Sequence, residues 1–246
     1  MDVLAHPLLA AAFFKSRRQA VPAGAVLVDV GGARIACSVT PGTPTVLYFA
    51  GNGETVAAAR RGIGAELTAL GLGVFLTERR GVGGSTGQQT FPALLDDAER
   101  LLRATETPPE RVVAFGRSLG SLAAVELASR HRLAGLVLES AIADLGERIR
   151  AQLDPAALGV TPEHLDAAVH ERFDQKQKLA RHRAPTLVLH AGTDERIDRS
   201  HALRLAMWAG SADKELVIFP RGGHADVLAA NRKAYARALR EFFARL

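Results

Sequence analysis

Residues 111–120 read RVVAFGRSLG, and residues 121–131 continue with helical spacing. The apolar start predicts a buried strand, so Ser118 would lie on a sharp turn between a strand and a helix. Side chains two positions before and after this serine would collide, which accounts for Gly116 and Gly120. Such a turn, a nucleophile elbow, presents the serine hydroxyl at a helix N-terminus, whereas the alternative is an ordinary Gly-Ser loop.

The same alternation of strands and helices continues on both sides of this turn. Continuous Val/Leu/Ile runs separated by helices predict a mostly parallel, eight-stranded α/β sheet with helices on both faces. Two of the strands flank Gly31-Gly32 and should form an antiparallel hairpin. The expected strands are 25–30, 34–39, 45–50, 73–77, 111–115, 133–139, 185–190 and 215–219, with helices at 54–70, 90–105 and 121–131.

Length and composition limit the class of protein. A chain of 246 residues suffices for a single domain, 1–246, and residues 142–183 are polar, helical in tendency and free of strands, which predicts a short cap-like insertion. The net charge of +5 comes from arginines that are dispersed along the chain, which argues against a nucleic-acid groove. Cys37 alone cannot form an internal disulfide.

The N-terminal residues 3–14 are apolar, but His6 and Pro7 interrupt them. They are too short to span a bilayer and lack a basic start, so we expect a cytoplasmic protein without a stable membrane anchor. A peripheral amphipathic helix is the alternative for this segment.

A nucleophilic serine needs an imidazole base, and the imidazole needs a carboxylate to orient it. Asp194 follows the strand at 185–190, and His224 follows the strand at 215–219 on a Gly-Gly loop. The chain order Ser, Asp, His and the position of each residue after a strand are those of the α/β-hydrolase arrangement. We therefore predict a triad of Ser118, Asp194 and His224.

Each predicted partner of Ser118 has an alternative candidate in the sequence. Asp198 lies farther from its strand and is expected to cap the helix that begins near Ser200, whereas Glu139 ends its own strand and could supply the acid. His190 lies on a strand and is expected to be a packed core histidine.

Acyl transfer also requires donors for the developing oxyanion. One should be the backbone N–H of Leu119, the residue after the nucleophile. The second should come from the loop after the strand at 45–50, which contains Gly51-Asn52-Gly53, and we assign it to the N–H of Asn52. A plain strand-to-helix turn is the alternative reading of this loop.

With these residues the chain resembles the α/β-hydrolase superfamily of serine hydrolases, and within it the BEM46-like proteins. The resemblance rests on Gly51-Asn52-Gly53, on the turn Arg80–Gly87 and on Gly116–Gly120, and it extends from about Val26 to the C-terminus. Two positions depart from the pattern: Ala50 stands where many relatives have histidine, and Glu78 where aspartate is usual. We expect the Arg80–Gly87 turn to support the site rather than take part in catalysis.

The resemblance implies hydrolysis of a small-molecule carboxylic ester or thioester through an acyl-enzyme, without a metal or organic cofactor. A peptidase or amidase on the same triad is the first alternative. The second is a non-catalytic member of the fold that binds a ligand or protein, although that reading predicts a damaged triad. A haloalkane dehalogenase is excluded, because it would need aspartate in place of Ser118.

Overall fold

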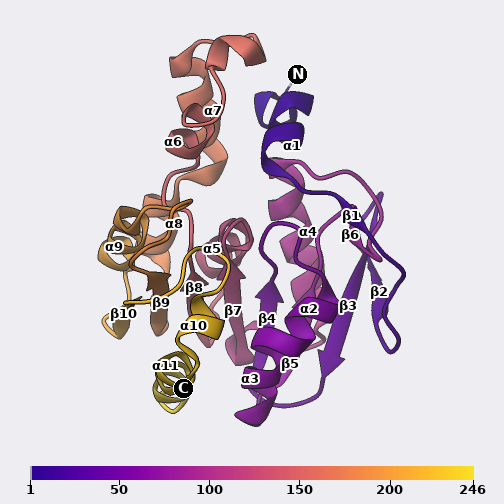
Figure 1. Ribbon diagram of the computed structural model, residues 1–246, viewed down its shortest axis with the longest axis vertical. Coiled ribbons are helices and arrows are strands. Elements are labelled where there is room, and N and C mark those ends of the chain that lie inside the picture. Colours follow the sequence, from indigo (N-terminus) through magenta and orange to yellow (C-terminus); the bar gives the residue numbers. More distant parts are fainter. Residues whose placement is uncertain (1) are drawn as a thin grey trace.

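The computed structural model describes residues 2–246, and its centre is a mostly parallel eight-stranded sheet (Figure 1). The strand order is β10-β9-β8-β7-β4-β5-β3-β2, in which only the pairs β2/β3 and β3/β5 are antiparallel. The predicted sheet and hairpin are therefore confirmed. The strands are β2 Val26–Asp29, β3 Arg34–Thr40, β4 Thr45–Phe49, β5 Gly73–Thr77, β7 Val112–Arg117, β8 Gly135–Glu139, β9 Thr186–Ala191 and β10 Lys214–Phe219.

Helices cover both faces of the sheet, and a separate apolar core lies on each face. One core joins the sheet to α4 (Phe91–Ala104), α5 (Gly120–Arg130), α8 (Gln175–Arg181) and α9 (Arg199–Trp208). The other joins it to α2 (Val56–Ala59), α3 (Ala65–Ala69), α10 (Val227–Ala230) and α11 (Arg232–Phe243). Burial on both faces explains why the central strands are continuously apolar in sequence.

Two predicted elements differ in detail. The helix expected over residues 54–70 is divided into α2 and α3 by a π-helical stretch, Arg60–Gly64, in which Gly62 leaves helical dihedral angles. A short parallel pair of β1 (Arg17–Arg18) with β6 (Val82–Gly83) has no counterpart in the prediction, because two residues are too few to show a period.

A third apolar cluster lies above the carboxyl ends of the strands, where α1 (Pro7–Phe13) and residues 142–183 meet (Figure 1). Phe91 at the start of α4 packs against Phe13, Phe14 and Phe173, with ring centroids 5.3, 5.0 and 6.1 Å apart. Residues 142–183 contain α6 (Leu145–Arg150), α7 (Pro162–Phe173) and α8, with a 3-10 turn at Pro155–Leu158. The N-terminal segment, α6 and α7 thus lie over the carboxyl ends of the strands, whereas α8, at the end of the predicted insertion, packs on one face of the sheet.

Within residues 2–246, no helix is both long and apolar enough to cross a bilayer.

Candidate active site

Ser118 occupies a strained turn between β7 and α5. Its φ angle is +52°, a left-handed conformation that side-chain-bearing residues rarely adopt. A Cβ at Gly116 would lie 2.8 Å from the Cβ of Ala124, and one at Gly120 would lie 2.8 Å from the Ala50 carbonyl oxygen. Both glycines are therefore required by close packing of the elbow on its helix and on β4, as the sequence predicted.

Ser118, His224 and Asp194 form a continuous hydrogen-bonded chain. The Oγ of Ser118 lies 2.8 Å from Nε2 of His224, and Nδ1 of His224 lies 2.9 Å from Oδ2 of Asp194. Because a carboxylate only accepts hydrogen bonds, we assign the ring proton to Nδ1, which leaves Nε2 free to accept the serine proton. Each residue follows its own parallel strand (β7, β9 and β10), so the three meet at one edge of the sheet.

The surroundings of Asp194 favour its ionised form. Its side chain is completely buried, and Oδ1 accepts hydrogen bonds from the backbone N–H groups of Arg196 and Ile197, both at 2.9 Å. Burial alone would raise the pKa of this carboxyl, but the hydrogen bonds from His224 and from these two amides outweigh it and lower the pKa. A charged carboxylate can therefore orient His224 and stabilise its protonated form.

The three residues considered as alternatives to Asp194 and His224 form other contacts. Asp198 accepts a hydrogen bond from the N–H of Ser200 and caps α9, as predicted. Glu139 forms an ion pair with Arg117 at 2.9 Å and accepts a hydrogen bond from the Tyr235 hydroxyl, away from His224. His190 is fully buried with Nε2 2.9 Å from the Ile197 carbonyl oxygen, and burial lowers its pKa.

The predicted oxyanion donors border the same cleft as the triad. Asn52 and Leu119 both line it, together with Ser118 and His224. Within residues 2–246, the backbone N–H groups of Asn52 and Leu119 donate no hydrogen bond to another protein group. The fold of residues 2–246 therefore leaves both N–H groups without an acceptor.

The Asn52 side chain ties the predicted oxyanion loop to the N-terminal segment. Its Nδ2 donates to the Phe13 carbonyl oxygen at 2.7 Å, and its Oδ1 accepts from the N–H of Lys15 at 2.9 Å. Arg79 adds a third hydrogen bond, from Nη2 to Oδ1 at 3.0 Å. Sequence reasoning missed these partners because residues 13–15 carry no motif and lie far from Asn52 in the chain.

Arg117, inside the elbow motif, connects the other loops of the site. Its guanidinium pairs with Glu54 at 3.1 Å and Glu139 at 2.9 Å, and it donates to the carbonyl oxygen of Ala225, beside His224, at 2.7 Å. Glu54 in turn accepts from the N–H of Gly51 at 2.9 Å. Burial disfavours the charge on Arg117, but the two glutamates raise its pKa above the ordinary value. The arginine within the motif was the only available indication of this network.

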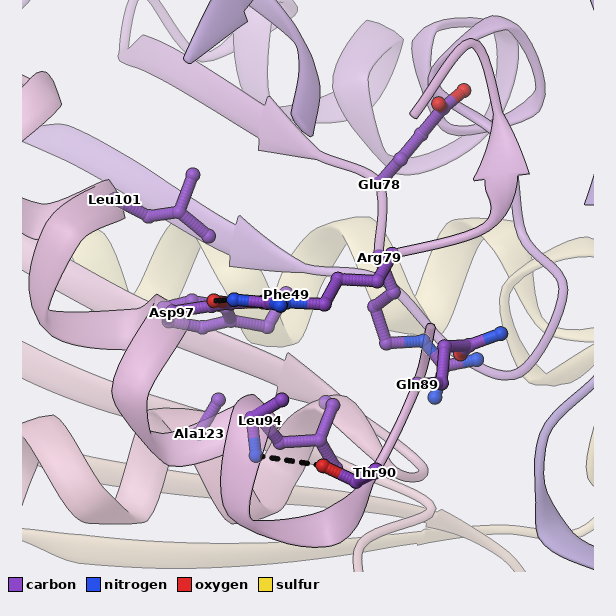
Figure 2. Close-up of a pocket in the computed structure, with 12 residues that line it drawn as sticks. Phe49, Glu78, Arg79, Gln89, Thr90, Leu94, Asp97, Leu101 and Ala123 are labelled. Carbon is purple, nitrogen blue, oxygen red and sulfur yellow. Dashed lines mark hydrogen bonds and ion pairs between the residues drawn. The ribbon is translucent and has the colours of Figure 1, made fainter. Parts of the chain in front are cut away.

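Glu78 and Arg79 diverge from the end of β5 (Figure 2). Glu78 accepts hydrogen bonds from the N–H groups of Val56 and Gly84, both at 2.9 Å, and from the Ser85 hydroxyl at 3.0 Å. It therefore holds the Arg80–Gly87 turn in place, consistent with a supporting role for that turn.

Arg79 lies on the other side, next to Gln89 (Figure 2), at a cavity of about 20 Å³. This volume matches about one water molecule. Neither Ser118 nor His224 lines it, so it is separate from the cleft that contains those two residues.

Three comparisons place the chain among known proteins. Residues 41–165 match the family model described as "Serine aminopeptidase, S33". The chain is 31% identical over 207 residues to an uncharacterized protein of Mycobacterium tuberculosis, covering 81% of this chain and 69% of that protein. It is 32% identical over 220 residues to alpha/beta hydrolase domain-containing protein aho-3 of Caenorhabditis elegans, covering 85% of this chain and 61% of that protein.

Among solved structures, the fold is similar to that of alpha/beta hydrolase domain-containing protein 10 from mouse, with a TM-score of 0.73 and 17% identity. The match covers 91% of this chain and 99% of that one.

Proposed function

Because this chain belongs to the α/β-hydrolase superfamily, we propose that it is a serine hydrolase that cleaves a carboxylic ester or thioester through an acyl-enzyme intermediate. The observation that carries the proposal is the hydrogen-bonded chain from Ser118 through His224 to Asp194, with distances of 2.8 and 2.9 Å. The positive φ of Ser118 supports it, since such strain at a serine is typical of a nucleophile elbow.

In the proposed reaction, Oγ of Ser118 attacks the substrate carbonyl carbon while Nε2 of His224 accepts the hydroxyl proton. Asp194 stabilises the imidazolium that forms. The carbonyl oxygen becomes an oxyanion, and the N–H groups of Asn52 and Leu119 donate to it. When the tetrahedral intermediate collapses, the bond to the alcohol or thiol breaks, and His224 returns its proton to the leaving group.

The second half of the reaction repeats these steps with water. His224 accepts a proton from the water as its oxygen attacks the acyl carbon, and the resulting oxyanion uses the same two donors. Collapse releases the carboxylic acid and returns the proton to Oγ of Ser118.

Replacement of the nucleophile tests the proposal. We expect Ser118→Ala to abolish hydrolysis of 4-nitrophenyl acetate and labelling by a fluorophosphonate probe, with the circular dichroism spectrum unchanged. Ser129→Ala is the matched control and should retain both properties, since Ser129 lies in α5 and its hydroxyl bonds, among the described residues, only to the Glu126 carbonyl oxygen. Hydrolysis or labelling that persists in Ser118→Ala contradicts the proposed nucleophile.

A peptidase or amidase is the second candidate, favoured by the description of the matching family as a serine aminopeptidase. The same triad serves both reactions, so the substrate decides between them. Rates on a 4-nitrophenyl ester and on the 4-nitroanilide of the same acid discriminate: we expect the ester to be cleaved much faster, and a comparable anilide rate would favour the peptidase.

A further inference from the structure

The cleft that contains Ser118 has an unbalanced charge. Three of its lining residues, Lys15, Arg148 and Arg196, are cationic, and no aspartate or glutamate lines it. The three come from separate parts of the chain: the segment after α1, helix α6 and the loop after β9. Three distant segments therefore contribute positive charge to the cleft around the proposed reaction centre.

These three charged side chains contribute little to holding the fold together. Among residues 2–246, the side chains of Lys15 and Arg148 form no ion pair or hydrogen bond, and Arg196 has only a 3.8 Å contact with Glu195, both being more than half exposed. Glu147, which precedes Arg148 in the chain, pairs instead with Arg204 at 2.8 Å. By contrast, Arg117 beside the triad is neutralised by two glutamates.

Three apolar side chains in residues 142–183 are occupied away from the cleft, whereas Ile142 lines it. Ile149, Leu158 and Leu165 are at most 5% exposed and pack within the third apolar cluster, against α1 and α4. None of them lines the cleft. They therefore do not supply a wall for a long acyl chain.

We propose that the substrate of this hydrolase carries an anionic group, a carboxylate or a phosphate, near the scissile carbonyl, and that Lys15, Arg148 and Arg196 bind it. The inference rests on the proposed function and specifies its substrate class. Guanidinium and ammonium groups suit such oxyanions, and their attraction strengthens where water is partly excluded.

A matched pair of esters tests this inference. 4-Nitrophenyl hydrogen adipate and 4-nitrophenyl hexanoate share the leaving group and the chain length, but only the adipate ends in a carboxylate. After subtraction of spontaneous hydrolysis, we expect kcat/KM to favour the adipate by about tenfold at low ionic strength, mainly through KM, and the preference to shrink in about 0.5 M NaCl as the charges are screened. Inorganic phosphate and adipate should each inhibit competitively, and their relative potency separates a phosphate site from a carboxylate site.

The double variant Arg148→Gln/Arg196→Gln should bring the ratio of the two kcat/KM values close to one. Arg199→Gln is the control, since Arg199 is an exposed arginine three residues from Arg196 that does not line the cleft, and it should keep the wild-type ratio.

Two failures are distinguishable. If the wild type hydrolyses both esters equally, or the double variant keeps the preference, the anionic substrate class is wrong while the hydrolase stands. If neither ester is hydrolysed and the fluorophosphonate does not label Ser118, the proposed function fails and this inference fails with it.

Discussion

Two arginines, the buried Arg79 and the half-buried Arg117, hold the loops on either side of Ser118 in opposite electrostatic settings. On the histidine side, Arg117 pairs with Glu54 and Glu139 and bonds to the carbonyl beside His224. On the oxyanion side, Arg79 makes one hydrogen bond, to Asn52, and its Nε and Nη1 atoms have no partner among residues 2–246. Burial lowers the pKa of Arg79 to about 10, whereas the pKa of Arg117 is raised.

The two arginines should therefore differ in how much they stabilise the fold and how much they position the site. A buried charge whose counter-charges remain after its removal is costly to delete, because the glutamates would be left unpaired. A buried charge with little compensation costs folding energy to retain, so its removal need not destabilise the protein. Arg117 should therefore matter to both folding and activity, and Arg79 mainly to the placement of Asn52.

The largest effect is expected for Arg117→Met. This change removes the counter-charge of Glu54 and Glu139, which keep only their hydrogen bonds from Gly51 and Tyr48 and from Tyr235 among residues 2–246, and should cost about 3–5 kcal/mol of unfolding free energy. For a chain of this size we expect the melting temperature to fall by roughly 10 °C, measured by differential scanning calorimetry.

The matched control is Arg111→Met. Arg111 is exposed just before β7, and within residues 2–246 its side chain makes only a 3.5 Å hydrogen bond to Thr43, so its loss should change the unfolding free energy by less than about 0.5 kcal/mol. Equal melting temperatures for Arg117→Met and Arg111→Met would show that the buried ion pairs do not stabilise the fold.

A smaller and different effect is expected for Arg79→Met. The methionine can still contact Phe14, over whose ring the guanidinium now lies at 5.8 Å, and the buried charge disappears. The unfolding free energy should stay within about 1 kcal/mol of the wild type or rise. Activity should nevertheless fall by about tenfold, mainly in kcat, because the Asn52 loop loses one of its three anchors next to the proposed oxyanion site.

Arg61→Met, an exposed arginine between α2 and α3, is the control for the loss of one positive charge and should keep wild-type kcat. If Arg79→Met reduces stability as much as Arg117→Met, the contrast between the two arginines is wrong. If its kcat is unchanged, Arg79 does not position the oxyanion loop.

On the histidine side, the sequence predicted both the triad and the elbow. On the oxyanion side, it predicted only the loop and not the contacts that hold it. Ser118, Asp194 and His224 each follow a strand, and the carboxyl ends of parallel strands meet at one edge, so chain order sufficed to bring them together. The backbone geometry of the elbow was equally accessible, because only Gly116 and Gly120 fit the space available.

The supporting contacts could not be predicted, because they join segments without a shared pattern. Arg117 and Ala225 are 108 positions apart, and Asn52 and Phe13 are 39 apart. Periodicity reports which face of an element is buried, but not which loop a polar side chain reaches. For the same reason the sequence predicted residues 142–183 only as a cap-like insertion and did not show what their apolar side chains contact, and the structure places Ile149, Leu158 and Leu165 in a core.

The smallest expected effect concerns Asp194 and pH, and it tests the histidine side without reference to catalysis. The pKa of Asp194 is lower in the folded protein than its unfolded value of about 3.9, so its ionised form contributes stability that is fully present above that value and is lost as pH falls through the folded pKa. The difference in unfolding free energy between wild type and Asp194→Asn, measured with urea, should therefore decrease as the pH falls from about 5 to below about 4. Glu195→Gln, at the exposed neighbouring position, should show no such decrease. A difference for Asp194→Asn that is independent of pH would mean that the hydrogen bonds from His224, Arg196 and Ile197 do not favour the charged carboxylate, and that the histidine side is held by the Arg117 network alone.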